Sequence, residues 1–324
     1  MIIRFKTIIG NNGVRRYEET IFPGSETELI FNRFLNNRQI GKARIRFYEV
    51  VKTIVLKYEG IYGIRMRDFS PESLHEFYHF IMHDRSHNYA TLILKALRAI
   101  FCWCRQTGVI DVSPFEGFRI PMERYASPFY LSLQDLDTIW KTDLTAKPAL
   151  AIQRDIFIFQ CNTGCRVSDL MRLTKHDIIN DTIQYIPKKT LNKKADTVTV
   201  PLNKIALTIL DRYRNFPGEM ILPFISVKNY NLSIKKILHI AGINYPVVVL
   251  DPITGSETKV QLHRIASSHL ARKTFIGNLY KSVKDPSLIS SMTGHAEGSR
   301  AFCRYRNIDI DIKRDLVKLL EMGE

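Results

Sequence analysis

The sequence predicts a two-domain protein built mainly from helices, with only a few short strands. Three observations indicate this. The chain has 324 residues, which is more than one typical domain. Apolar residues recur at helical spacing over most of its length. A stretch without helical periodicity, carrying Pro114, Pro121 and Pro128, separates the two halves.

The first half is expected to hold a small helical domain over residues 37–118. Residues 1–36 carry the turn signals Asn11-Asn12-Gly13 and Pro23-Gly24, which predict an irregular or short-stranded leader. Serine at an N-cap and proline at the first helical position mark a clear helix start at Ser70-Pro71. Three helices are expected, from Ile45 to a stop at Gly60, from Ser70-Pro71 onward, and from about Tyr89 to Gly108.

The second half should form a larger domain over residues 132–324, after a linker at 119–131. Ser132-Leu133-Gln134-Asp135 restarts a helix, and the helix from Pro148 to about Asn162 is apolar on most faces, which predicts a central position in the core. Strands at 183–187 and 197–201 should flank a lysine-rich hairpin. The remaining expected elements are helices at 203–214 and 226–241, an extended pair within 245–262, helices at 265–281 and 286–294, and a short helix holding Tyr305.

Charge predicts a polyanionic partner. The net charge is +15, and residues 1–125 hold 19 Lys and Arg against 13 Asp and Glu, so +6 lies in the first part and +9 in the rest. A basic excess shared by both parts suits two domains that grip one nucleic-acid duplex, although a basic surface alone would also suit an anionic membrane. A merely basic tail is disfavoured.

Cysteines and hydropathy place the chain among intracellular proteins. The five cysteines lack the spacing of a zinc site, and we expect all of them to be reduced thiols. They are Cys102, Cys104, Cys161, Cys165 and Cys303. The first residues lack the apolar stretch of a signal peptide, and no run of eighteen apolar residues occurs. We therefore expect a soluble, cytoplasmic protein with no membrane association.

Four motifs follow one another in the second half. They are Thr163-Gly164-Cys165-Arg166-Val167-Ser168-Asp169-Leu170, the hairpin around Lys189, Ser268-His269-Leu270-Ala271-Arg272-Lys273-Thr274-Phe275, and Gly294-His295 followed by Tyr305. The order of these residues resembles the active-site signature of the tyrosine recombinases, the phage integrase family. That signature is Arg, Lys, His-x-x-Arg, Gly-His and Tyr. Two departures occur: Lys273 stands where His or Arg is commoner, and Tyr305 follows His295 by ten residues instead of nine.

The chemistry of phosphodiester cleavage explains why these residue types belong together. An anionic phosphodiester resists attack, and planar arginine forks such as those of Arg166 and Arg272 stabilise the growing charge. Tyr305 would be the nucleophile, and His269 and His295 would move protons or hydrogen-bond the phosphate.

A lysine would protonate the departing 5′-oxygen. The family's Lys-Thr pairing selects Lys189, while Lys188, Lys193 and Lys194 remain alternatives. By resemblance, Asp169 orients the site instead of reacting. A late tyrosine at core spacing, Tyr280, is a poor candidate for the nucleophile.

The resemblance implies more than the residues themselves do. It implies a mainly α fold with a small antiparallel β-sheet, in which a helical core-binding domain and a catalytic domain form a C-shaped clamp around DNA. It also implies a mobile-element integrase that forms a 3′-phosphotyrosine without metal, ATP or another cofactor. Its partners would be double-stranded DNA with inverted half-sites, three further copies of the chain in a tetramer, and accessory DNA-bending proteins at the nucleoid.

Two other functions remain open at this point. A type IB topoisomerase shares the chemistry but relaxes supercoils as a monomer, and a DNA-binding regulator could keep the scaffold without the reaction. Retention of all six predicted reacting residues disfavours the regulator. The tail from Asp309 to Glu321 has helical apolar spacing. This apolar stripe could pack on its own domain, whereas the resemblance implies that the helix docks into a neighbouring protomer.

Overall fold

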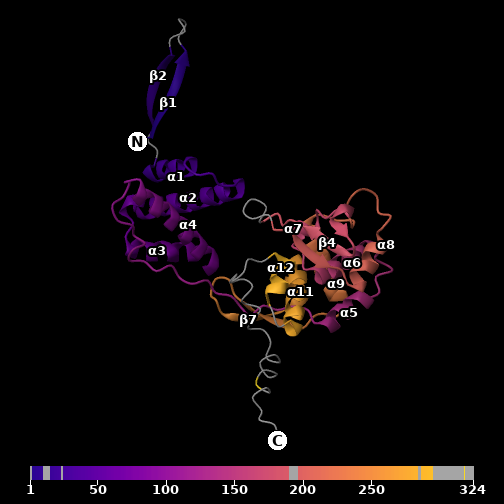
Figure 1. Cartoon of the computed structure of the whole chain (residues 1–324). Coiled ribbons are helices and arrows are strands. Elements are labelled where there is room, and N and C mark those ends of the chain that lie inside the picture. The colour runs from indigo at the N-terminus through magenta and orange to yellow at the C-terminus, as the bar shows by residue number, and fades with distance from the viewer. Residues whose placement is uncertain are drawn as a thin grey trace. The chain divides into compact units, whose positions relative to one another are not determined.

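The fold is described from a computed structural model of the chain (Figure 1). The structure describes residues 2–9, 15–22, 25–189, 196–283, 286–294 and 317, with side chains from residue 25 onward except at 282 and 286. The chain divides into two compact units. Unit 1 comprises Met1–Tyr125 with Leu250–Ser256, and unit 2 comprises Ala126–Val249 with Glu257–Glu324.

Unit 1 is a helical body preceded by a hairpin. Strands β1 (Ile2–Ile9) and β2 (Arg15–Phe22) pair antiparallel, with Ile2 opposite Phe22. Four helices follow, α1 (Glu26–Asn36), α2 (Lys42–Tyr62), α3 (Pro71–Met82) and α4 (His87–Gln106), with a 3₁₀ turn η1 (Met66–Asp68) between α2 and α3. Their apolar faces share one core, which includes Phe31, Val55, Phe77 and Leu97.

Two details of the first half differ from the sequence-based expectation. Helix α1 lies within the predicted leader and contributes Ile30, Phe31 and Phe34 to the core, so the described part of the helical body has one helix more than the three expected. The predicted stop at Gly60 is wrong, because α2 continues to Tyr62 and ends at Gly63, whose φ of 71° is the left-handed conformation that a helix terminus favours.

Unit 2 combines helices with two small sheets. Its helices are α5 (Leu133–Lys141), α6 (Pro148–Thr163), α7 (Val167–Leu170), α8 (Lys204–Arg212), α9 (Val227–Ile240), α10 (Leu262–Ile265), α11 (Ser268–Ser282) and α12 (Pro286–Thr293), and a 3₁₀ turn η2 (Lys175–Asp177) follows α7. One sheet has the order β3 (Ile178–Ile179), β4 (Thr182–Tyr185), β5 (Val198–Pro201), all antiparallel, and the other pairs β6 (Pro246–Leu250) with β7 (Glu257–Gln261).

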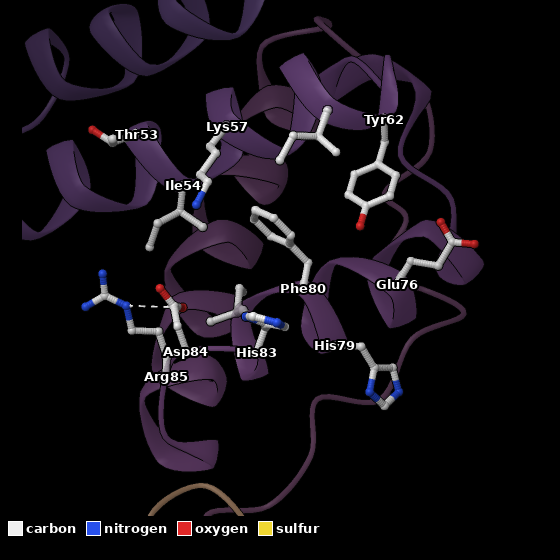
Figure 2. A pocket seen from close by; sticks show the side chains of 12 residues that line it. Thr53, Ile54, Lys57, Tyr62, Glu76, His79, Phe80, His83, Asp84 and Arg85 are labelled. Carbon is white, nitrogen blue, oxygen red and sulfur yellow. Dashed lines mark ion pairs between the residues drawn. The ribbon is translucent and has the colours of Figure 1, made fainter.

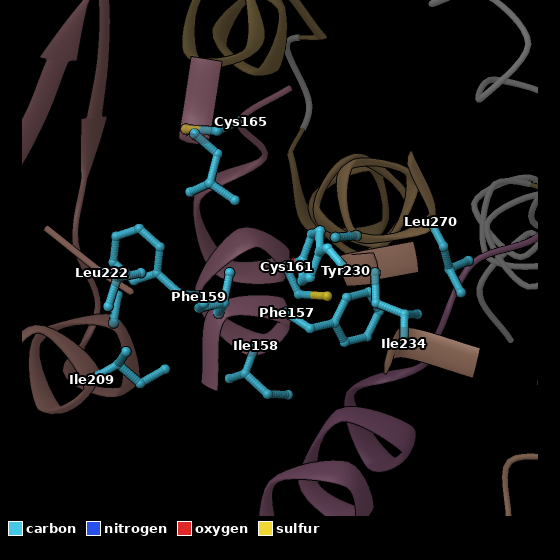
Figure 3. Packing of buried hydrophobic residues seen from close by; sticks show 14 of the residues in the cluster. Phe157, Ile158, Phe159, Cys161, Cys165, Ile209, Leu222, Tyr230, Ile234 and Leu270 are labelled. Carbon is cyan, nitrogen blue, oxygen red and sulfur yellow. The ribbon is translucent and has the colours of Figure 1, made fainter. Parts of the chain in front are cut away.

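Helix α6 is central to the core of unit 2, as its apolar composition predicts. Phe157, Phe159 and Cys161 are buried between side chains of α8, α9 and α11 (Figure 3). Tyr230 on α9 donates its hydroxyl hydrogen to Gln160 Oε1 of α6 at 2.9 Å, which satisfies both buried polar groups. Because α6 is fixed on several sides, the loop that leaves its C-terminus starts from a rigid point.

The predicted fold class, mainly α with a small antiparallel sheet, is confirmed. The predicted short helix around Tyr305 and the predicted tail helix lie outside the described residues. The C-shaped clamp around DNA stays a prediction. Within the part of the chain that the structure describes, every helix is too short or too polar to cross a membrane.

Candidate active site

Arg166 is placed by the end of helix α6. Gly164 follows α6 with a φ of 65°, and its N–H donates to Gln160 O at 2.9 Å. A Cβ at Gly164 would lie 2.4 Å from Phe275 Cδ1, so both the backbone conformation and the close packing require glycine. The turn directs the chain through buried Cys165 into α7, for which Arg166 is the N-cap residue.

Arg272 lies on α11 and is almost completely buried, with 2% of its surface exposed. Its Nη1 donates to Gly164 O at 2.9 Å and its Nη2 donates to Thr293 O at 2.5 Å. A buried guanidinium requires such acceptors, because an unpaired charge in the interior is costly. Arg272 therefore joins the turn after α6 to the C-terminal end of α12.

Both arginines converge on the C-terminus of α12. Arg166 Nη2 donates to Gly294 O at 3.1 Å, one residue beyond the carbonyl that Arg272 contacts. The last carbonyls of a helix lack intrahelical donors and carry partial negative charge, which favours cations there. Arg166 Nη1 has no hydrogen-bond partner among the residues that the structure describes. Each guanidinium is thus oriented by protein carbonyls.

His269 lies one helical turn before Arg272 on α11, and part of its side chain is open to solvent while the rest is surrounded by protein atoms. Desolvation, together with the positive charges of Lys273, Arg272 and Arg166, lowers the pKa of the His269 imidazole to about 4. The ring is therefore neutral near pH 7 and has one nitrogen free to accept a proton. A bound phosphate would offset the three positive charges and raise this pKa again.

Asp169 is the buried anion beneath these cations. Its side chain is fully buried, its Oδ2 lies 4.0 Å from Arg166 Nη1, and its Oδ1 accepts the Lys188 N–H at 2.9 Å. Lys188 and Lys189 are themselves exposed at the start of the lysine-rich hairpin. Asp169 therefore connects the arginine segment to the segment that carries the predicted general acid.

Gly294 closes the site from the side of α12. Its φ is 60°, and a Cβ there would lie 3.1 Å from both Pro187 Cγ and Val198 Cγ2. The Gly-His motif is thus packed against the root of the hairpin, where a larger residue would meet two side chains. Beyond Gly294 only Val317 is described, so the predicted residues His295 and Tyr305 lie outside the described residues.

The structure brings together four of the predicted residues, Arg166, Asp169, His269 and Arg272. Sequence reasoning missed Arg172, whose guanidinium contacts Asp169 Oδ1 at 3.4 Å and donates to the carbonyl of Ile186. The sequence offers no signal for this role, because an arginine after a short helix is usually solvated and its partner Ile186 lies fourteen residues away. In the described part of the chain, no three His, Cys, Asp or Glu side chains gather as metal ligands.

One open hollow of about 850 Å³ lies in unit 1 between α2 and α3, and the residues that line it include none of the predicted site residues (Figure 2). Its apolar lining includes Ile54 and Phe80, and Lys57 Nζ lies 5.8 Å from the centre of the Phe80 ring. A lysine over an aromatic face is a common surface arrangement that needs no ligand.

Comparison with known proteins identifies a matching family. The profile of the phage integrase family matches residues 130–310. Tyrosine recombinase XerD of Listeria innocua is 21% identical over 204 residues, which are 63% of this chain and 66% of that protein. The chain thus spans just under two thirds of the length of this curated relative.

Solved structures of integrases share the fold. The Tn1549 transposon integrase in complex with transposon right-end DNA superposes with a TM-score of 0.70 at 14% identity, covering 92% of this chain and 100% of that one. A lambda integrase dimer bound to a core site gives a TM-score of 0.64 at 15% identity, covering 86% of this chain and 77% of that one. A lambda integrase tetramer bound to a Holliday junction gives a TM-score of 0.61 at 15% identity, covering 85% of this chain and 77% of that one.

Proposed function

Because the chain belongs to the phage integrase family, whose members break and rejoin DNA, we propose that it is a site-specific DNA recombinase. It would cleave one strand at a time through a 3′-phosphotyrosine on Tyr305, with neither metal nor ATP. The observation that carries the proposal is the convergence of Arg166 and Arg272 on the carbonyls of Thr293 and Gly294. His295 is the next residue in the sequence.

The two guanidinium groups suit the non-bridging oxygens of a phosphodiester. They are permanently charged, and protein carbonyls already orient them, so little reorganisation is needed when charge grows in the transition state. The neutral imidazole of His269, exposed beside them, can accept a proton or hydrogen-bond an oxygen of the bound phosphate. The two guanidinium groups thus supply the positive charge that a metal ion supplies in other nucleases.

The covalent steps balance without an external energy source. The phenolate oxygen of Tyr305 attacks phosphorus, and the bond from phosphorus to the 5′-oxygen breaks while Lys189 gives that oxygen a proton. In the second step a 5′-hydroxyl attacks the phosphotyrosine, returns its proton to the lysine and releases Tyr305. Each broken phosphodiester is replaced by a phosphotyrosine ester of similar energy, so ATP is not required.

Recombination also needs an assembly. We propose that four protomers bring together two duplexes with inverted half-sites, aided by accessory DNA-bending proteins, at the nucleoid in the cytoplasm. The lambda integrase tetramer on a Holliday junction supports this arrangement, because the chain shares its fold. The distribution of positive charge over both parts of the chain, +6 and +9, is consistent with a duplex held by two units.

A plasmid assay tests the proposed function against relaxation alone. Two copies of the DNA that flanks the gene, each containing inverted half-sites, are placed on one supercoiled plasmid and incubated with the protein in EDTA. We expect deletion or inversion of the intervening DNA, read by restriction digestion. Relaxed plasmid without rearrangement would instead identify a topoisomerase, and binding without either product would identify a regulator.

A further inference from the structure

Arg172 bridges two segments of the proposed active site. It follows α7, and its guanidinium has contacts in two directions. Nη2 donates to the backbone carbonyl of Ile186, just beyond strand β4, and lies 3.4 Å from Asp169 Oδ1. The side chain is 41% exposed, yet both of its partners belong to the structure beneath it.

The carboxylate of Asp169 faces one backbone donor and two guanidinium groups. Oδ1 accepts the Lys188 N–H at 2.9 Å and faces Arg172 at 3.4 Å, while Oδ2 lies 4.0 Å from Arg166. A fully buried carboxylate is stable only when cations and hydrogen-bond donors surround it. Removal of Arg172 would take away the guanidinium that faces Oδ1, while Arg166 Nη1 stays 4.0 Å from Oδ2, a distance beyond a hydrogen bond.

The root of the lysine hairpin is therefore held from both sides of Pro187. The carbonyl of Ile186 accepts from Arg172, and the N–H of Lys188 donates to Asp169. Pro187 itself is buried. Lys189 is the next residue, so the path of its backbone is set at this point and the long side chain extends from a fixed root.

We propose that Arg172 is a positioning residue for the general acid. It acts through Asp169 and the Ile186 carbonyl and holds the hairpin root so that the Lys189 ammonium reaches the departing 5′-oxygen. This inference rests on the proposed function. An ordinary exposed arginine would contribute little to the rate of DNA cleavage, because surface ion pairs are weak.

The test uses a substrate that does not need the acid. Single-turnover cleavage is measured on a suicide duplex with either a normal phosphodiester or a 5′-bridging sulfur at the cleavage site, because the sulfur leaves without protonation. Arg172→Ala should slow cleavage of the normal substrate by roughly 10-fold or more, a part of the effect of a general acid. With the sulfur substrate its rate should return to within about 3-fold of the unmodified protein.

Arg172→Lys provides a second variant that keeps the charge near Asp169. A single ammonium cannot reproduce the geometry of the planar fork, so its defect should be intermediate and should also disappear with sulfur. Arg214→Ala is the matched control, because Arg214 is 77% exposed and pairs locally with Asp211 at 2.6 Å. It should cleave both substrates at the normal rate.

The outcomes separate this inference from the proposed function. Equal slowing of Arg172→Ala and Arg172→Lys on both substrates, or normal rates on both, would overturn the positioning role. Lys189→Ala serves as the reference, because the sulfur substrate should restore it if Lys189 is the acid. Absence of any covalent adduct with the unmodified protein would contradict the proposed function itself.

Discussion

At the scale of single residues, the two arginines of the site differ in how much of the fold depends on them. Arg272 is buried and supplies charged donors to the carbonyls of Gly164 and Thr293, whereas the Arg166 side chain is 21% exposed and bonds to Gly294 O. We expect Arg272→Ala to lower the free energy of unfolding by about 3 kcal/mol and Arg166→Ala by about 1 kcal/mol.

Both arginine variants should nevertheless slow cleavage similarly, by roughly 10²-fold or more, which is typical for loss of one transition-state donor. Denaturant unfolding and single-turnover cleavage under conditions where each variant is folded separate the two effects. Equal stability of the two variants would contradict the buried role of Arg272. A normal cleavage rate of either would remove that arginine from the site.

His269 provides a prediction about pH. Its folded-state pKa of about 4 lies below the usual value of 6.5, so the unfolded chain binds the proton more readily. The native state therefore loses stability as pH falls from about 6.5 towards 4, and His269→Asn should reduce this loss relative to the unmodified protein.

NMR titration of the His269 ring, assigned by its disappearance in His269→Asn, measures the same property directly. We expect a pKa well below 6.5 in the free protein and a higher value when a duplex is bound, because phosphate offsets Arg166, Arg272 and Lys273. A pKa at or above 6.5 in the free protein would show that the neighbouring cations do not act on this ring.

Much of the candidate site could be predicted because its motifs are local in sequence. Thr-Gly-x-Arg and His-x-x-Arg fix Arg166, His269 and Arg272 by short patterns, and the structure brings these segments together. The catalytic roles of these three residues, and those of Lys189, His295 and Tyr305, stay predictions. Arg172 could not be predicted, since its significance depends on the carbonyl of Ile186, which only the folded hairpin brings near.

At the scale of elements, the residue pattern that predicts the start of α3 was more reliable than the glycine that predicts the end of α2. Ser70 accepts the Ser73 N–H at 3.2 Å and begins α3 where the sequence predicts, because capping chemistry involves only neighbouring residues. Gly60 failed as a stop, because packing of α2 in unit 1 outweighs the modest cost of a glycine within a helix. Helix α1 was missed because turn signals dominate the segment before it.

The turn after α6 yields a prediction about an element boundary. Gly164→Ala would place a methyl group against Phe275 and strain a backbone with φ of 65°, and we expect a loss of roughly 3 kcal/mol in the free energy of unfolding. Cleavage should also slow, because the Gly164 carbonyl orients Arg272.

Gly63→Ala is the matched control for this change. Its φ is 71°, but a Cβ there would have no atom within 4 Å, so only the backbone cost of about 1 kcal/mol applies. Thermal or denaturant unfolding compares the two variants. Equal losses would mean that the contact with Phe275 relaxes freely and that the turn does not need close packing.

At the scale of the whole molecule, the net charge of +15 predicts a strong dependence of DNA binding on salt. Lys and Arg contacts to phosphates release counterions, so affinity should fall by roughly 10³-fold or more between about 50 and 200 mM salt. Fluorescence anisotropy with a labelled half-site measures this. A nearly flat salt dependence would contradict a duplex held by both basic parts of the chain.

The central claim is that Tyr305 forms a covalent bond with DNA, and one gel tests it most directly. Unmodified protein, Tyr305→Phe and the control Tyr280→Phe are incubated in EDTA with a nicked, labelled target site and separated under denaturing conditions. We predict a protein–DNA adduct with the unmodified protein and with Tyr280→Phe, and none with Tyr305→Phe, which should still bind the site. An adduct with Tyr305→Phe, or its loss in Tyr280→Phe alone, would contradict the assignment of the nucleophile.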